Sequence, residues 1–116
     1  SRVRRLIEKG CDVNQAEEDG TTPAYIAAQN GHTAALELLV KAPGCDVNQS
    51  DKDGRTPAYA AAYNGKTAAL ELLVEVPGFD VNQSEKDGRT PAYVAAEEGQ
   101  TAVLELLVEA GCDVNQ

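Results

Sequence analysis

The sequence predicts an all-α repeat protein, an α-solenoid of helix-turn-helix units that stack side by side. The tetrapeptide Asp-Val-Asn-Gln starts at Asp12, Asp46, Asp80 and Asp113, at intervals of 34, 34 and 33 residues. Intervals of this size are typical of solenoids. The 116 residues are 42% apolar but include one Phe, no Trp and no Met. A core of Leu, Val, Ile and Ala lets helices approach closely, which favours thin layers.

Each unit contains the same parts in the same order. In the first, an extended segment leads to the turn Glu18-Asp19-Gly20, which predicts a hairpin-like finger. Thr22-Pro23 predicts a helix start, because Thr can accept a backbone N–H and Pro suits the first helical position. This helix should end at Gly31, and a second should run from about Thr33 to Lys41. Helices of roughly 8–10 residues are unstable alone in water, so each unit must pack on neighbours.

These motifs resemble the ankyrin repeat. The sequence reads Gly-x-Thr-Pro at Gly20–Pro23, then Ala-Ala-x-x-Gly at Ala27–Gly31, then Leu-x-Leu-Leu and Gly-x-Asp-Val-Asn, and this pattern recurs three times. The resemblance implies an ankyrin-repeat stack with β-hairpin-like fingers, forming a single domain over 1–116. We expect a partial repeat at 1–15 and full repeats at approximately 16–49, 50–83 and 84–116.

The sequence departs from the family pattern in two ways. Tyr25, Tyr59 and Tyr93 stand where the family usually has His, so contacts between repeats must be rebuilt around a longer side chain. We expect this tyrosine stripe to pack between repeats. Pro43 and Pro77 add a residue to the loop after the second helix of their units, which changes the expected rotation between repeats.

Charge and hydropathy exclude several classes of partner. The net charge of −9 disfavours nucleic acid, because an acidic surface repels phosphate backbones. No apolar run approaches the roughly 20 residues that span a bilayer, so we expect no membrane insertion. The chain does not begin with Met, and we expect it to be a piece of a longer protein. Apolar side chains at uncapped end repeats predict end-to-end self-association or fraying.

The sequence contains no recognisable catalytic or metal-binding motif. Cys11, Cys45 and Cys112 occupy the same position in three of the four units, and Phe79 fills it in the remaining one. A helix-packing separation of roughly 8–10 Å between neighbouring repeats exceeds the roughly 7 Å that a disulfide tolerates. Unpaired thiols favour a reducing, intracellular location, either cytoplasmic or nuclear. His32 is the only histidine, and the carboxylates recur in similar environments. We therefore expect no enzyme activity, no cofactor and no metal.

Partner-binding residues are expected where the repeats differ, since stacking explains the shared positions. The resemblance places these positions on the concave surface of fingers and first helices. The candidates are Glu18, Asp19, Thr21, Gln29, Asn30, Lys52, Asp53, Arg55, Tyr63, Asn64, Lys86, Asp87, Arg89, Glu97 and Glu98. Four of them form a predicted basic strip flanked by carboxylates, with Tyr63 near its middle: Lys52, Arg55, Lys86 and Arg89. Tyr and Arg are enriched among interface hot spots, so we expect a protein partner with an acidic edge.

Three functional hypotheses remain open at this point. The first is a protein–protein interaction module or scaffold. The second is an engineered, consensus-like ankyrin scaffold without a natural partner, against which the cysteines and the irregular repeat lengths count. The third is a regulatory domain of a larger enzyme or channel.

Overall fold

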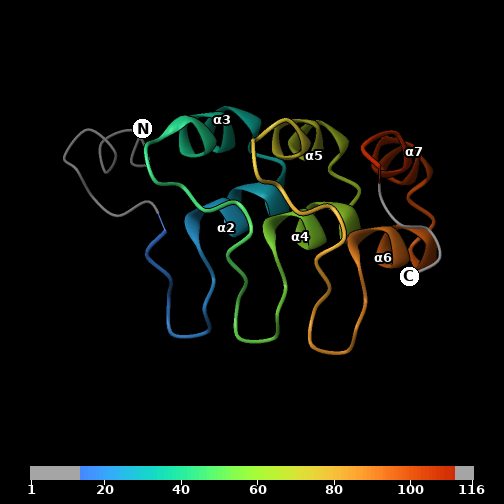
Figure 1. Cartoon of the computed structure of the whole chain (residues 1–116), viewed down its shortest axis with the longest axis horizontal. Helices are drawn as coiled ribbons and strands as arrows, with labels where there is room; N and C mark the ends of the chain where they lie inside the picture. The colour runs from blue at the N-terminus through green and yellow to red at the C-terminus, as the bar shows by residue number, and fades with distance from the viewer. Residues whose placement is uncertain (1–13, 112–116) are drawn as a thin grey trace.

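The computed structural model describes residues 14–111, which form a stack of helical hairpins. The first helices of the repeats are α2 (Pro23–Asn30), α4 (Pro57–Tyr63) and α6 (Pro91–Glu97), and the second are α3 (Thr33–Lys41), α5 (Thr67–Val74) and α7 (Thr101–Glu109). Figure 1 shows the two sets as parallel layers, with the fingers projecting below α2, α4 and α6. This arrangement confirms the predicted all-α repeat stack, and the partial repeat expected at 1–15 falls almost wholly outside the described residues.

Each first helix begins with the cap that the sequence predicts. The Thr22 hydroxyl accepts the N–H of Tyr25 at 3.1 Å, and Thr56 and Thr90 repeat the contact in α4 and α6. A proline occupies the first turn of all three helices. Gly31 closes α2 with a left-handed backbone, at φ 70°. These local signals explain why the first helices begin at the same position in every repeat and end within one residue of the same position.

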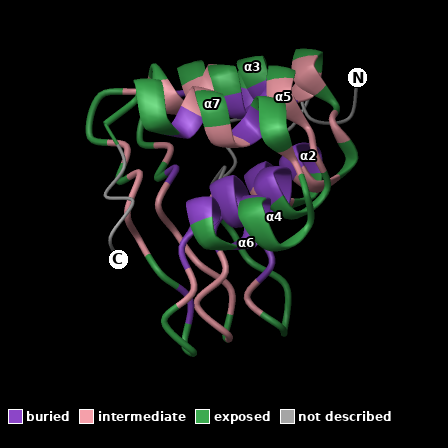
Figure 2. Cartoon of the chain, turned by 90° about the vertical axis from the view of Figure 1, so that its right-hand side faces the viewer, coloured by how far each residue is buried: buried purple, intermediate pink, exposed green. Residues whose placement is uncertain are grey.

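The core lies between the two helix layers. Each second helix contributes a leucine that is wholly inaccessible to solvent: Leu36 of α3, Leu70 of α5 and Leu107 of α7. Small residues such as Ala28 and Ala61 face them from the first helices. Figure 2 shows the buried residues concentrated between the layers while the outward surfaces stay exposed. The core therefore extends along the stack as a thin layer of Ala and Leu side chains, as the composition predicts.

The repeated Asp-Val-Asn-Gln motif joins neighbouring repeats through hydrogen bonds. The Asn48 side chain donates to the carbonyl of Gly78 at 2.7 Å and accepts the N–H of Asp80 at 2.9 Å. The Gln83 side chain donates to the carbonyl of Asn48 at 3.0 Å. Asn14 makes the same set of contacts with the following repeat. The motif is thus a polar spine that bonds each repeat to the next.

The fingers are tight hairpin-like turns, and no β-strand is assigned within residues 14–111. We define the first, second and third fingers as residues 17–21, 51–55 and 85–89. In the second, the Asp51 N–H donates to the Arg55 carbonyl at 2.9 Å. Adjacent fingers are linked where the Lys52 N–H donates to the Asp19 carbonyl and the Lys86 N–H to the Asp53 carbonyl. The fingers therefore stack in register with the helices.

The tyrosine stripe packs unevenly along the stack. Tyr59 is buried and Tyr25 is half-buried, as expected for packing between repeats. Tyr93 is 51% exposed and departs from that expectation. The reason is positional, because no described repeat lies beyond α6 and α7 to cover it.

Candidate partner-binding groove

A groove of about 400 Å³ opens between the first helices and the fingers. It lies where α2, α4 and the second and third fingers meet. Its lining residues are Tyr25, Gln29, Arg55, Tyr59, Ala60, Tyr63, Asn64 and Arg89. None of these side chains is a carboxylate, although the chain carries a net charge of −9. The groove is thus an aromatic and cationic hollow on an otherwise acidic protein.

Two tyrosines of α4 form an aromatic wall in the groove. Tyr59 and Tyr63 lie one helical turn apart, with ring centroids separated by 6.4 Å and planes inclined by 20°. Of the two, Tyr59 is buried, whereas Tyr63 is 46% exposed. Burial raises the pKa of Tyr59 and also that of Tyr25. Both hydroxyls therefore stay protonated at neutral pH and remain able to donate a hydrogen bond.

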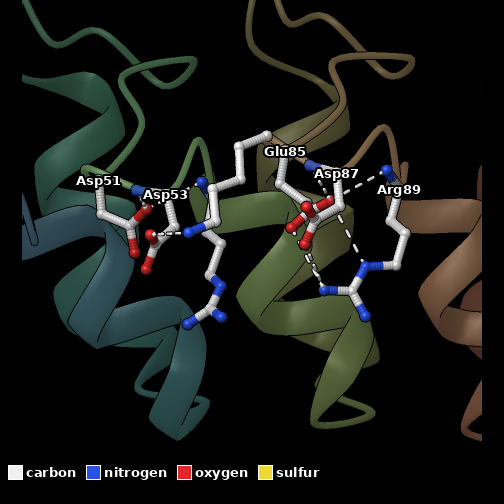
Figure 3. A network of polar contacts seen from close by, with 7 residues as sticks. Asp51, Asp53, Glu85, Asp87 and Arg89 are labelled. Carbon is white, nitrogen blue, oxygen red and sulfur yellow. Dashed lines mark hydrogen bonds and ion pairs between the residues drawn. The ribbon is translucent and has the colours of Figure 1, made fainter.

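Two of the four residues of the predicted basic strip, Lys86 and Arg89, form ion pairs with carboxylates of the fingers. Lys86 forms an ion pair with Asp53 of the preceding finger at 2.9 Å, and the hydrogen bond from Lys86 lowers the pKa of Asp53. Arg89 contacts Glu85 at 3.3 Å and Asp87 at 3.5 Å, as Figure 3 shows. These contacts leave little unmatched positive charge on the third finger.

Glu85 is the most unusual carboxylate of the groove region, because only 4% of its surface is exposed. One oxygen accepts the backbone N–H groups of Asp87 and Arg89, at 2.8 and 3.1 Å. Burial alone would raise the pKa of Glu85, but the hydrogen bonds from Arg89 and Asp87 lower it overall. Glu85 therefore stays ionised inside the protein and fixes both the third finger and the Arg89 side chain.

Arg55 occupies the same position in the second finger but lacks that partner. Asp51 replaces Glu85 there, and its carboxylate accepts the backbone N–H groups of Asp53 and Arg55, both at 2.9 Å. The Arg55 guanidinium forms no ion pair within residues 14–111, and its Nε is buried without a hydrogen-bond acceptor. The guanidinium carbon lies 6.0 Å from the centre of the Tyr59 ring, within the range of a cation–π contact.

The structure gathers some of the predicted site residues and separates others. Five line the groove: Gln29, Arg55, Tyr63, Asn64 and Arg89. Six lie on the fingers and do not line the groove: Glu18, Asp19, Lys52, Asp53, Lys86 and Asp87. Three are exposed at the ends of first helices: Asn30, Glu97 and Glu98. Thr21 is buried and lines a separate hollow beside Ile26 instead of this groove.

Three groove residues are absent from the sites that the sequence predicts: Tyr25, Tyr59 and Ala60. Tyr25 and Tyr59 belong to a stripe shared by all repeats, which the sequence assigns to packing alone. Ala60 differs from its counterparts in the other repeats, but a small apolar side chain gives no sign of a binding site. The spacing of Tyr59 and Tyr63, four residues apart on a helix, is a signal that places both on one face.

The described residues offer little for catalysis or metal binding. Cys45 is a free, half-buried cysteine packed against the core, and burial raises the pKa of its thiol, which makes it a poor nucleophile. His32 is exposed at the start of α3. No cluster of metal-ligating side chains occurs in residues 14–111, and no helix there is long and apolar enough to cross a membrane. Cys11 and Cys112 lie outside the described residues.

Comparison with known proteins agrees with the fold. A family model described as ankyrin repeats (3 copies) matches residues 35–116, and one described as ankyrin repeats (many copies) matches residues 6–58. A segment of 37 residues is 51% identical to cortactin-binding protein 2 of Ornithorhynchus anatinus. That match covers 32% of this chain and 2% of the relative, so the chain spans a small fraction of that protein. With matched models over most of its length and the stacked hairpins they imply, the chain belongs to the ankyrin-repeat family.

Proposed function

We propose that this chain is a protein-interaction module that holds a protein partner in the groove between α2, α4 and the second and third fingers. Ankyrin repeats are generally protein-interaction modules and are typically not catalytic. The observation that carries the proposal is the groove itself, whose lining includes both the half-exposed Tyr63 and Arg55. Tyr and Arg at the centre of a concave surface are the residues that most often dominate binding energy.

The organisation of the repeats and the location of the protein are also proposals. The helix pairs α2–α3, α4–α5 and α6–α7 each fall within one of the segments 16–49, 50–83 and 84–116, which supports these as full repeats. The free thiol of Cys45 supports a reducing, intracellular location. The name of the relative assigns cortactin binding to that protein. The shared segment is about one repeat long, so the similarity supports the repeat type and leaves the partner of this chain open.

The groove is tested by removing its two central side chains together. The double variant Tyr63→Ala, Arg55→Ala should bind a partner captured from cell extract about tenfold more weakly than the wild type, because a hot-spot pair is lost. Affinity is measured by biolayer interferometry on the captured protein. Circular dichroism should show an unchanged helical fold, since Tyr63 is half-exposed and Arg55 makes no ion pair within the described chain.

A matched control removes one apolar and one cationic side chain from the outer layer. Leu38 and Lys41 of α3 are both exposed and lie away from the groove. The double variant Leu38→Ala, Lys41→Ala should therefore bind as tightly as the wild type. Equal binding by the groove variant, or loss of binding by the outer-layer variant alone, would place the interface elsewhere.

A further inference from the structure

We propose that Arg55 anchors an Asp or Glu side chain of the protein partner, completing an ion pair that the second finger does not make for itself. The proposal rests on the groove being the binding surface and adds the chemistry that the groove recognises. Lys52 and Arg55 are the two basic residues of the described fingers without an ion pair, and of these Arg55 alone lines the groove. The argument comes from comparing two fingers that are nearly identical in sequence.

The two fingers differ by one methylene group at the residue that faces the arginine. In the third finger, Glu85 accepts the backbone N–H groups with one oxygen and still reaches Arg89, with Oε1 at 3.4 Å from Nε and Oε2 at 3.3 Å from a terminal nitrogen. In the second finger, the shorter Asp51 makes the same two backbone contacts but no ion pair with Arg55. Figure 3 shows the Glu85 and Asp51 sites side by side. Arg89 thus has a carboxylate in contact, whereas Asp51 and Asp53 attract Arg55 without forming an ion pair with it.

The Arg55 guanidinium is already removed from part of its hydration. Its Nε is buried without an acceptor, and the whole residue is only partly accessible. A buried donor without a partner is unfavourable. Because Nε is wholly buried, a carboxylate from outside would contact the guanidinium through its terminal nitrogens. The guanidinium fork matches a carboxylate in geometry as well as in charge. Arg55 is therefore prepared for an anionic ligand before the partner arrives.

The surroundings of Arg55 favour a carboxylate over a phosphate. The groove contributes only one cation without a carboxylate of its own, since Glu85 and Asp87 contact Arg89. Asp51 and Asp53 belong to the same finger as Arg55 and interact with it electrostatically, and the protein has a net charge of −9. A dianion would be repelled more strongly than a single negative charge by these groups. The stacked rings of Tyr59 and Tyr63 offer a flat apolar surface for the residues next to the acidic side chain.

The sharpest variant supplies the missing carboxylate from within the chain. In Asp51→Glu, the longer side chain should form an ion pair with Arg55 as Glu85 does with Arg89. Arg55 would then have an internal partner, while the net charge of the protein stays the same. The Glu85 finger shows that the turn accommodates Glu at this position. The signal of the Arg55 Nε–H in nitrogen-15 NMR spectra should shift and exchange more slowly in this variant. That readout tests the internal pairing without any ligand.

The binding probe is a library of random 12-residue peptides displayed with their C-termini fused to a coat protein. In this format a free C-terminal carboxylate is not available, so an anionic contact must come from a side chain. Peptides recovered on the wild-type protein should contain an Asp or Glu whose replacement by Asn or Gln weakens binding about tenfold or more. Asp51→Glu should weaken binding of the same peptides by a similar factor. Recovery of no peptide that depends on Arg55 would overturn the proposal.

The reciprocal change is a matched control within the same chain. Glu85→Asp should leave Arg89 without its close partner and should not weaken the selected peptides, because Arg55 is untouched. Should Asp51→Glu prove unfolded by circular dichroism, Arg55→Gln replaces it as the variant that removes the anchor. Inorganic phosphate is added as a competitor in parallel with acetate. Displacement of the peptides by phosphate at much lower concentration than acetate would overturn the assignment to a carboxylate.

The outcomes separate this proposal from the function on which it rests. Suppose that the double variant Tyr63→Ala, Arg55→Ala loses binding while the Asp51→Glu protein and the acid-to-amide peptides bind normally. The groove is then the interface, but Arg55 does not bind a carboxylate of the partner. If the double variant binds normally as well, the groove is not the interface. Loss of binding in all three cases supports both proposals.

Discussion

At the scale of single residues, small departures from the repeat decide where the concave surface is hollow. Ala60 occupies the position filled by Ile26 in the first full repeat and by Val94 in the third. It lines the groove, yet only 2% of its own surface is exposed. The space of the groove therefore exists partly because the middle repeat has the smallest side chain at this position.

Filling that space should stabilise the fold and narrow the groove. Ala60→Val should raise the free energy of unfolding by about 1 kcal/mol, because added methyl groups gain contacts where room exists. Urea denaturation followed by circular dichroism measures the change. The control is Ala61→Val at a wholly buried position that does not line the groove, where overpacking should cost about 1–3 kcal/mol. A less stable Ala60→Val protein would mean that neighbouring side chains already occupy the space.

At the scale of elements, the fingers are held by backbone contacts that only glycine permits. Gly54 has φ 81°, and a Cβ there would lie 2.9 Å from the backbone nitrogen of Lys86 in the next finger. Gly88 has nearly the same backbone, at φ 87°, but a Cβ added there would meet no atom within 4 Å. Gly88 is thus required only for the left-handed backbone of its turn. Gly54 is required for that backbone and also for the close approach of the next finger.

Alanine at these two glycines should give unequal losses of stability. Gly88→Ala should cost about 1–2 kcal/mol, because an alanine is forced into the left-handed region. Gly54→Ala has the same backbone cost and also pushes the second and third fingers apart. It should therefore lower the free energy of unfolding by about 1 kcal/mol more than Gly88→Ala does. Thermal and urea unfolding of the two variants provide the comparison. Equal losses would show that contact between fingers adds nothing to the stability of the stack.

Elements were easier to predict from the sequence than the site was. The helix bounds follow from local signals, such as Thr22 as a cap and Gly31 as a stop, which act over a few residues and repeat three times. The groove depends on which side chains meet across repeats, and Tyr59 gives no local sign of facing a hollow. The contrast between Arg55 and Arg89 depends on the reach of Asp51 against that of Glu85, which becomes apparent only from distances.

At the scale of the whole molecule, stability is spread along the stack, because each repeat packs on its neighbours. Side chains on the end repeats are consequently left partly uncovered: Ile26 is 43% exposed and Val108 is 50% exposed. Val94, the counterpart of Ile26 in the last described repeat, packs behind α4 and is wholly buried, and Val74, the counterpart of Val108, is half-buried. Exposed apolar faces of this kind favour contact between copies of the chain.

We therefore expect concentration-dependent association. Sedimentation velocity from micromolar to millimolar concentration should show the average mass rising, as copies meet end to end. Ile26→Lys should reduce the rise, because it places a charge on the exposed apolar hollow that Ile26 lines with Pro23 and Ala35. A chain that remains monomeric throughout the range, with terminal helices protected from hydrogen exchange, would contradict this expectation.

The polar spine of asparagines also determines how the protein would respond to mechanical load. Asn48 bonds its own repeat to the following one through Gly78 and Asp80, and Asn14 makes the equivalent bonds one repeat earlier. A pulling force applied at the two ends would therefore load these junctions in series, and the weakest would yield first. The chain would lengthen in steps of one repeat, because one repeat would unfold at a time while the remaining repeats stayed folded.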